Sequence, residues 1–306
     1  MTVLRSYDEM LQAAAQAGPV PVVIAAAHEH EVLLAASEAQ SRGIVRATLV
    51  GDKSAIQRMA REHRLDLAGM PIVDEPDDRA AANRAMEIVA SGEARVAVKG
   101  QVQTPVFLHA ALRREAGLRT ERLVTHVGVF EVPGFDRLLF ITDGGVVLFP
   151  TLEQKVEIVS NAIAVARGLG VSTPRVALLA AADEVLDELP VTVEIATIVA
   201  LQERWQAEGA IVGGPFLLDT AVSPDIARAR QRGGRVAGQA EVLVGPDVQS
   251  VNTMAKGITY FAGGRMAGLV VGARVPLVVG SRADPPRTRL VCIAAGALLA
   301  ARTLAS

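Results

Sequence analysis

The sequence has too little cysteine for a disulfide and too few aromatic residues for a surface built on base stacking. Its 306 residues include one cysteine, Cys292, and only 3% aromatic residues. Cys292 lies in the apolar segment LVCIAAGALL, where we expect a buried, unreactive thiol. The scarcity of aromatic rings disfavours recognition of nucleic acid by stacking.

Basic and acidic residues are also nearly balanced. The chain carries 31 basic and 33 acidic residues, a formal net charge of -2, so any site for an anion must be local. The longest apolar runs are interrupted by charge before the ~20 residues that a membrane span needs. The N-terminus MTVLRSYDEM lacks the features of a secretory signal. We therefore expect a cytoplasmic protein that binds neither nucleic acid nor membranes.

Several motifs with a known chemistry are missing. There is no G-x-x-x-x-G-K-[ST] and no G-x-G-x-x-G after the first predicted strand, which argues against a P-loop ATPase and an ordinary Rossmann dehydrogenase. A G-x-S-x-G serine nucleophile is also missing. The five histidines show no H-E-x-x-H spacing. We expect no metal site, although His28 and His30 in the segment HEH could in principle chelate.

The order of predicted elements indicates an α/β fold. Strand-like runs at 20–27, 46–52 and 94–100 are separated by helical patterns, which is typical of a parallel, doubly wound sheet. The segment 123–142 contains two strand-like runs joined by a turn and predicts an antiparallel hairpin. The length and the 50% hydrophobic content favour two domains.

Polar residues cluster where the predicted strands end, the edge at which open α/β sheets bind ligands. Lys99 and Gly100 precede a helix for which Thr104 is the predicted N-cap. The group Ser281, Arg282 and Asp284 suits an anion, because a guanidinium fork and a hydroxyl can both donate to phosphate oxygens. The alternative is that Arg282 and Asp284 pair on the surface. The other clusters contain Asp143, Asp219, Asn252 and Lys256.

Five ordered segments resemble the phosphate acetyltransferase and phosphate butyryltransferase family. They are VKGQVQTPVFLHAAL, HVGVFEVPGFDRLLFITD, GAIVGGPFLLDTAVS, VNTMAKGITYFAG and VPLVVGSRAD. The resemblance implies an isocitrate/isopropylmalate dehydrogenase-like fold, with two doubly wound α/β domains and an active-site cleft between them. We place the first domain at 1–141 and 270–306 and the second at 142–269. The resemblance also implies a homodimer.

The activity implied by the resemblance is the reversible conversion of acyl-CoA and inorganic phosphate into acyl phosphate and CoA. Coenzyme A and phosphate are then substrates, and no tightly bound cofactor is expected. Ser281 and Arg282 would bind phosphate and stabilise the transition state, with Asp284 as a candidate base. The expected substrate contacts are Lys99, Gly100, Thr104, Asp143, Asp219, Asn252 and Lys256.

The sequence departs from the acetyl-type pattern in two places. Thr288 and Arg289 lie where acetyl-type enzymes carry an acidic residue, so Asp284 is the nearest acid. Gly213 lies where the family usually has aspartate, which leaves Asp219 as the retained contact.

The segment FEVPGFDRLLFITD favours the butyryl-type branch, so we expect acyl chains longer than acetyl. Three alternatives stay open at this point. They are a phosphate acetyltransferase, a metal- and NAD(P)-dependent hydroxyacid dehydrogenase, and a non-catalytic paralogue that binds acyl phosphate or CoA.

Overall fold

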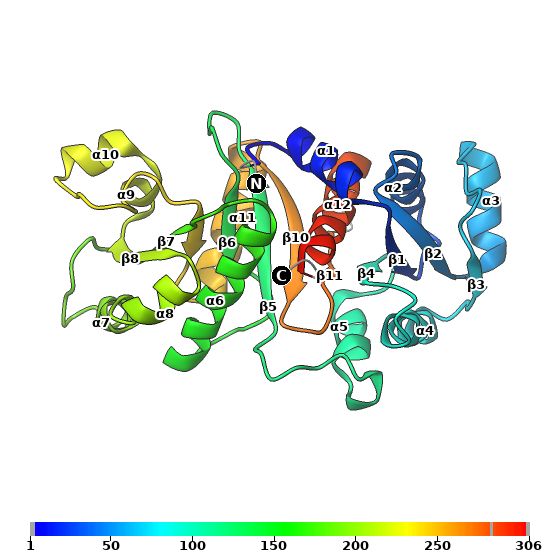
Figure 1. The fold of residues 1–306 in the computed structure, drawn as a ribbon, viewed down its shortest axis with the longest axis horizontal. Helices are drawn as coiled ribbons and strands as arrows, with labels where there is room; N and C mark the ends of the chain where they lie inside the picture. The colour runs from blue at the N-terminus through cyan, green and yellow to red at the C-terminus, as the bar shows by residue number, and fades with distance from the viewer. Residues whose placement is uncertain (1–3, 282–283, 304–306) are drawn as a thin grey trace. The chain divides into compact units, whose positions relative to one another are not determined.

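The computed structural model describes residues 4–281 and 284–303, which divide into two compact units (Figure 1). The central unit contains residues 4–6 and 123–266, and the terminal unit contains residues 7–122 and the chain from 267 onward. The first domain change predicted from the sequence lies at 141/142, whereas the compact units change at 122/123. The reason is that the predicted hairpin at 123–142 pairs with a later strand, so it lies with the central part of the chain.

The terminal unit is built on a mostly parallel sheet. Its strands lie in the order β3-β2-β1-β4-β11-β10, and only β10 runs antiparallel to its neighbour β11. The four central strands are rich in Val, Leu, Ile and Ala, as expected for strands covered on both faces. The strands are β1 (Val20–Ala25), β2 (Val45–Gly51), β3 (Ile72–Asp74), β4 (Val96–Lys99), β10 (Arg265–Val271) and β11 (Leu277–Val278).

Helices connect these strands, and several begin at side-chain caps. Asp52 and Asp77 accept hydrogen bonds from backbone N–H groups in the first turns of α3 and α4, which stabilises these helix starts. The predicted cap at Thr104 is off by one residue, because Gln103 is the extended N-cap and Thr104 is the first helical residue. The helices are α1 (Tyr7–Ala17), α2 (His30–Ser41), α3 (Lys53–His63), α4 (Asp78–Ala90), α5 (Thr104–Leu112), the short 3₁₀-helix η1 (Arg114–Ala116) and α12 (Pro286–Thr303).

The helix α12 supplies much of the core of the terminal unit. It packs against α1 and α2 and against β1, β4 and β11. A Cβ at Gly296 would lie 2.4 Å from a methyl group of Val278, so glycine allows the close approach to the sheet. Cys292 is 1% exposed, and burial raises the pKa of its thiol to about 12. The predicted buried thiol is thus confirmed, and a thiol with this pKa is unreactive at neutral pH.

The strands of the central unit lie in the order β5-β6-β9-β7-β8. The antiparallel pairing of β5 with β6 confirms the predicted hairpin, and the pairs β6–β9, β9–β7 and β7–β8 are parallel. The strands are β5 (Thr125–Glu131), β6 (Leu139–Thr142), β7 (Arg175–Leu179), β8 (Ile211–Phe216) and β9 (Val242–Val244). The helices are α6 (Leu152–Gly168), α7 (Pro190–Val199), α8 (Gln202–Ala207), α9 (Leu218–Val222), α10 (Pro224–Ala229) and α11 (Val248–Phe261).

Parallel pairing decides where the polar loops lie. Because parallel strands end at the same edge of a sheet, each unit presents the loops after its strands together. None of the helices in the described ranges is long and apolar enough to cross a membrane.

The close approach of the Gly100 backbone to neighbouring carbonyl groups leads to a prediction about the stability of the fold. A Cβ at this position would lie 2.3 Å from the carbonyl oxygen of Ala26 and 2.6 Å from that of Ala25. We expect Gly100→Ala to lower the free energy of unfolding by about 1–3 kcal/mol, because backbone must move to admit the methyl group. Urea unfolding measures this change.

The matched control is Gly145→Ala, since nothing lies within 4 Å of a Cβ at Gly145. That variant should stay within ~0.5 kcal/mol of the wild type. Equal stabilities of the two variants would contradict the assigned role of Gly100.

Candidate functional site

Three loops meet at one edge of the sheet in the terminal unit. Val278 of β11 lies opposite Val98 of β4, and Lys99 of β4 lies opposite Ala25 of β1. The loops that follow β1, β4 and β11 therefore leave neighbouring strands at the same edge. This edge carries three of the predicted site residues, Lys99, Gly100 and Ser281.

Lys99 holds the loop that follows β4. Its side chain is buried, and Nζ donates hydrogen bonds to the carbonyl oxygens of Gly100 (3.1 Å) and Val102 (3.2 Å). Lys99 also lines a small cavity together with Gly280 and Arg289. Thr104, in the first turn of α5, is half-buried. The lysine thus fixes the backbone of its own loop beside the turn that follows β11.

Two hydrogen bonds link Ser281, which follows β11, to Asp284. Oδ2 of Asp284 accepts a hydrogen bond from the backbone N–H of Ser281 at 2.6 Å. The backbone N–H of Asp284 donates to the carbonyl oxygen of Ser281 at 3.1 Å. Arg282, the predicted phosphate ligand, lies outside the described residues. The carboxylate of Asp284 therefore binds the backbone of Ser281.

A buried ion pair below this turn was not foreseen from the sequence. Arg289, which is 5% exposed, donates to both carboxylate oxygens of Glu29, with distances of 2.9 and 2.7 Å. Nε of Arg289 donates to the carbonyl oxygen of Asp284 at 3.4 Å. The two partners are 260 residues apart in the chain, and no local pattern links them. Through this pair, the loop after β1 supports the turn after β11.

Asp143, at the end of β6 in the central unit, organises the loop that follows it. The side chain is 4% exposed, and its two oxygens accept four backbone hydrogen bonds. The donors are the N–H groups of His126 (3.0 Å), Gly145 (2.8 Å), Val146 (2.8 Å) and Val147 (3.3 Å). An acceptor that is used in this way shapes the loop rather than offering free oxygens to a ligand.

The other two predicted residues near this loop lie on α11. Nδ2 of Asn252 donates to the carbonyl oxygen of Gly144 at 2.9 Å, so the structure brings Asn252 and the Asp143 loop together. Lys256 is exposed one helical turn further along α11. Residues four apart share a helix face, so the Lys256 ammonium belongs to the same face as Asn252.

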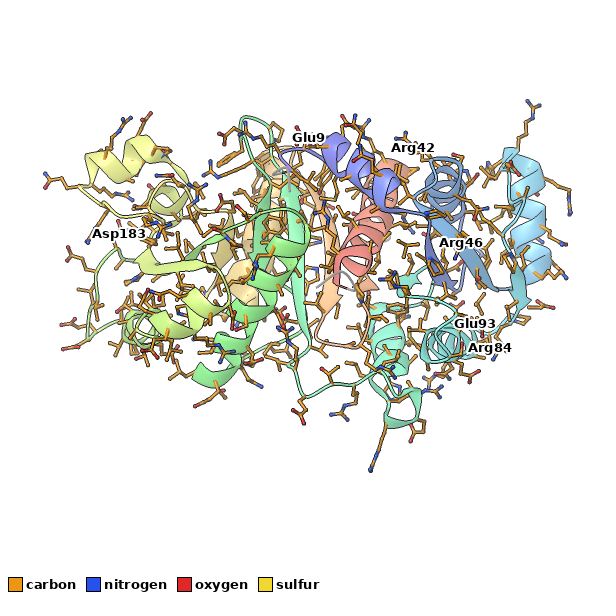
Figure 2. The ribbon with its side chains drawn as sticks, in the orientation of Figure 1. Glu9, Arg42, Arg46, Arg84, Glu93 and Asp183 are labelled. Carbon is orange, nitrogen blue, oxygen red and sulfur yellow. The ribbon has the colours of Figure 1, made fainter. Side chains whose placement is uncertain are left out.

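Asp219 lies apart from the Asp143 loop, at the start of α9 after β8. Its carboxylate pairs with the guanidinium of Arg230 at 2.5 and 2.9 Å, and this hydrogen bonding holds the pKa of Asp219 below its usual value. Asp183, labelled in Figure 2, accepts hydrogen bonds from Leu217 N (2.8 Å) and Thr220 Oγ1 (2.9 Å). The sequence analysis did not single out Asp183, which has no motif of its own.

Gly213, the second departure from the family pattern, leaves no free space for a side chain. A Cβ there would lie 3.2 Å from both the Phe216 ring and a methyl group of Val236. The chain therefore lacks the family's aspartate carboxylate at this position, and the side chains of Phe216 and Val236 pack against Gly213.

The histidines of the HEH segment have separate partners. Nε2 of His28 lies 3.1 Å from Asp78, and its Nδ1 accepts from the backbone N–H of Asp52 at 3.3 Å. His30 lies 3.5 Å from Glu31. Within residues 4–281 and 284–303, no group of three or more His, Cys, Asp or Glu side chains is arranged to hold a metal ion.

His126, on β5, has a buried Nδ1 with no hydrogen-bond partner among the described residues. Burial lowers the pKa of the imidazole, and the negative charge of Asp143 opposes this shift. Burial is the larger cause, so the ring is neutral at neutral pH. The sequence offers no signal for this residue beyond its place in a strand.

Comparison with known proteins shows which chains this one resembles. The family model described as phosphate acetyl/butaryl transferase matches residues 6–84 and 78–297. A phosphate butyryltransferase of Clostridium beijerinckii is 39% identical over 298 residues, covering 97% of this chain and 99% of the relative. A phosphate acetyltransferase of Rhizobium meliloti is 40% identical over 300 residues, covering 98% and 95%.

Solved structures agree with these sequence matches. The crystal structure of a branched-chain phosphotransacylase from Enterococcus faecalis V583 has a TM-score of 0.80 and 27% sequence identity, and the match covers 92% of this chain and 99% of that chain. A phosphotransacetylase from Streptococcus pyogenes has a TM-score of 0.83 at 16% identity, with coverage of 98% and 100%. The second match shows the fold alone.

The Arg289–Glu29 pair makes a second prediction about stability. We expect Arg289→Met to lower the free energy of unfolding by about 1–3 kcal/mol, because it leaves the half-buried Glu29 carboxylate without its partner. The control Arg287→Met removes an exposed pair with Asp8 and should cost ~1 kcal/mol or less. Urea unfolding of both variants measures the difference.

The double variant Glu29→Leu/Arg289→Met distinguishes a lost charge partner from lost packing. Most of the stability should return in it, because no charge is then buried alone. Equal losses in Arg289→Met and Arg287→Met would show that the buried pair has no special role.

His126 makes a prediction about pH. The pKa of His126 in the folded chain lies below the ordinary 6.5. As the pH is lowered, the unfolded chain therefore binds a proton at this residue before the folded chain does. The contribution of His126 to the free energy of unfolding is then at its full value above about pH 6.5. It falls as the pH is lowered towards the folded pKa, by at most ~1.4 kcal/mol per pH unit. His126→Gln should remove this part of the pH dependence in urea unfolding between pH 7.5 and 5.5.

The control is His63→Gln, which changes an exposed histidine. In this variant the free energy of unfolding should depend on pH as it does in the wild type. A His126→Gln variant whose slope matches the wild type would refute the assignment.

Proposed function

The chain belongs to the phosphate acetyl/butaryl transferase family, and within that family we propose that it acts on short, butyryl-type acyl chains. It is a phosphate acyltransferase, which interconverts acyl-CoA plus phosphate with acyl phosphate plus CoA. Coenzyme A and phosphate are the substrates of this reaction. The isocitrate dehydrogenase-like arrangement of two doubly wound domains is part of the proposal.

The reaction defines what the site must supply. A phosphate oxygen attacks the thioester carbonyl, the C–S bond breaks, and CoA leaves as the thiolate. Negative charge grows on the carbonyl oxygen next to an anionic nucleophile, so fixed cationic and N–H donors give the largest catalytic effect. In the reverse direction the CoA thiol must lose a proton to a base.

The turn after β11 is the proposed place for phosphate. Ser281 and Arg282 are the proposed ligands, and the hydrogen bonds between Ser281 and Asp284 support this role because they limit the conformations of the turn. A site that is held in place before substrate arrives needs less reorganisation during the reaction. Asp284 is the proposed base. Lys99, Gly100 and Thr104 shape the neighbouring loop.

The central unit contributes proposed contacts to coenzyme A. Lys256 is the best described candidate, because its exposed ammonium can pair with the phosphates of this polyanion. Asn252 lies on the same face and links α11 to the Asp143 loop. Asp143 acts through this loop. Asp219 is proposed as a contact that works together with its partner Arg230.

The segment FEVPGFDRLLFITD, which resembles the butyryl-type branch, supports the butyryl-type assignment over acetyl. The departure at SRADPPRTR agrees with it, because Thr288 and Arg289 lie in the neighbourhood where acetyl-type enzymes carry an acidic residue. Arg289 is instead a cation paired with Glu29. The identities of 39% and 40% to a butyryl- and an acetyltransferase do not separate the two.

A thiol-release assay with a series of acyl-CoA esters tests the proposal. We expect phosphate-dependent CoA release with kcat/KM about tenfold or more higher for butyryl-CoA than for acetyl-CoA, because each methylene contributes ~1–3 kcal/mol of discrimination. Arg282→Ala should lose turnover by about 100-fold or more, since it removes the cationic donor at the proposed phosphate site. The matched control Arg287→Ala should keep the wild-type turnover.

Each result has a definite meaning. Faster turnover of acetyl-CoA would assign the chain as a phosphate acetyltransferase. Phosphate-dependent release that persists in the presence of EDTA would exclude a metal-dependent reaction. No phosphate-dependent release with any ester would leave the non-catalytic binder, which the packed Gly213 position favours. The expected homodimer stays a prediction.

A further inference from the structure

Two of the three loops at the candidate phosphate site are joined by backbone hydrogen bonds. The N–H groups of Gly100 and Gln101, after β4, donate to the carbonyl oxygens of Ala25 and Ala26 at 2.8 and 2.9 Å. Ala25 ends β1 and Ala26 follows it. Because main-chain groups alone make this link, it does not depend on the identity of a side chain.

The side chain of Arg289 connects the segment after β11 to the loop after β1. Arg289 lies in the first turn of α12 and is buried. Its Nη1 and Nη2 donate to the two carboxylate oxygens of Glu29 at 2.9 and 2.7 Å. Its Nε donates to the carbonyl oxygen of Asp284 at 3.4 Å, a long hydrogen bond. One guanidinium thus contacts both loops.

Glu29 gives this guanidinium its direction. Arg289 lines a small cavity together with Lys99 and Gly280, and the rest of the lining is apolar. These apolar residues are Val32, Val98, Val278, Cys292 and Ile293. Apolar side chains do not fix the orientation of a guanidinium, whereas two parallel hydrogen bonds to a carboxylate do. The placement of Arg289 Nε beside Asp284 therefore depends on Glu29.

We propose that Arg289 and Glu29 are positioning residues for the use of phosphate, which hold Ser281 and Asp284 in place without contacting substrate. The inference rests on the proposed function, in which Ser281 binds phosphate and Asp284 is the base. Asp284 passes the effect on, because its carboxylate accepts a hydrogen bond from the N–H of Ser281 at 2.6 Å. A displacement of about 1 Å at a reacting group can cost ~100-fold in rate.

The pair can hold the segment without changing the net charge of the site. Arg289 and Glu29 carry opposite charges, so replacing both leaves the sum of the charges unchanged. Replacing Arg289 alone would also weaken the attraction for an anion through the lost charge. The double variant Glu29→Leu/Arg289→Met therefore separates positioning from charge, since it removes the contact with Asp284 but keeps the net charge.

Steady-state kinetics of thiol release by the double variant test the proposal. We expect the KM for phosphate to rise about tenfold, the effect of misplacing one hydrogen bond to a charged ligand. The KM for acyl-CoA should stay within about twofold of the wild type, because the proposed coenzyme A contacts belong to the central unit. Urea unfolding of the same variant should show that most of the stability has returned. A defect in phosphate use that persists there does not come from unfolding.

Two single variants are matched to this test. Arg287→Met changes an exposed arginine of the same helix and should keep both KM values. Arg289→Lys keeps a cation with three donor hydrogens, which can reach both Glu29 and the carbonyl oxygen of Asp284. This variant should bring the KM for phosphate back to within about threefold of the wild type.

Hydrogen–deuterium exchange of the full chain, read by mass spectrometry, measures the placement of the segment without an activity assay. The N–H groups of Ser281 and Asp284 both donate hydrogen bonds, and in the double variant they should exchange about tenfold faster or more. The N–H groups of Gly100 and Gln101 are held by backbone acceptors and should exchange as in the wild type.

The two measurements separate failure of this inference from failure of the proposed function. A wild-type protein without phosphate-dependent release would disprove the proposed function, and the exchange rates would then decide whether the pair holds the segment. Wild-type release with an unchanged KM for phosphate in the double variant would disprove the inference alone. A KM for acyl-CoA that rises as much as the KM for phosphate, or unchanged exchange at Ser281 and Asp284, would do the same.

Discussion

The parallel pairing of β11 with β4 is the constraint on which the candidate phosphate site depends. The strand β11 has only two residues, yet Leu277 and Val278 lie opposite Ala97 and Val98. Chain segments that are far apart in the sequence therefore end side by side at one edge of the terminal unit. Without this pairing, the turn at Ser281 would have no fixed relation to Lys99. The buried helix α12, which packs against both strands, supports the pairing from one face.

Charged residues at the strand ends bind the backbone of their own loops. Lys99 donates to two carbonyl groups, Asp143 accepts from four N–H groups, and Asp284 closes its own turn. Burying a charge without such partners is costly, so these bonds are a condition for placing charge at the sheet edge. The same bonds hold the loops in one conformation, which is what a site for an anionic transition state needs.

Local patterns in the sequence predicted much of the fold and the position of most candidate residues. The hairpin was predictable because the Pro133–Gly134 turn lies between two β-branched runs. The polar residues Lys99, Asp143 and Ser281 were found because strand ends are recognisable from hydrophobic runs that stop. Their hydrogen-bond partners could not be predicted, because they depend on tertiary contacts. Glu29 and Arg289 are 260 residues apart, and neither lies in a motif that points to the other.

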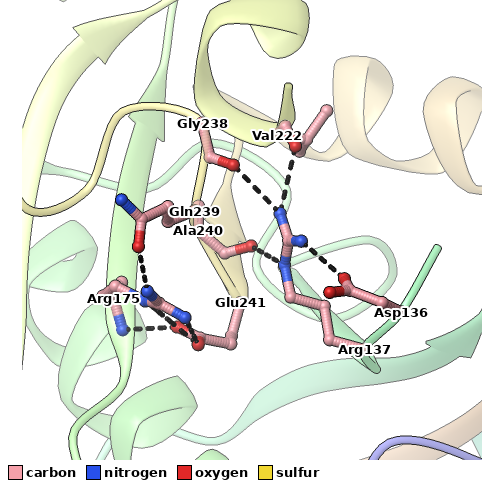
Figure 3. A network of polar contacts seen from close by, with 8 residues as sticks. All are labelled: Asp136, Arg137, Arg175, Val222, Gly238, Gln239, Ala240 and Glu241. Atoms are coloured by element: carbon pink, nitrogen blue, oxygen red, sulfur yellow. Dashed lines mark hydrogen bonds and ion pairs between the residues drawn. The ribbon is translucent and has the colours of Figure 1, made fainter. Parts of the chain in front are cut away.

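The two edges of the central sheet handle charge in different ways, and packing of individual groups explains the difference. At the carboxyl edge, the carboxylates of Asp143 and Asp183 accept hydrogen bonds from N–H and O–H donors, which stabilise the charged form where it lies. At the amino edge, the charge of the buried Glu241 is matched by the guanidinium of Arg175 (Figure 3). A field that decays over about 10 Å at ordinary ionic strength is set by such local arrangements. Composition alone therefore cannot reveal how charge is distributed at the two edges.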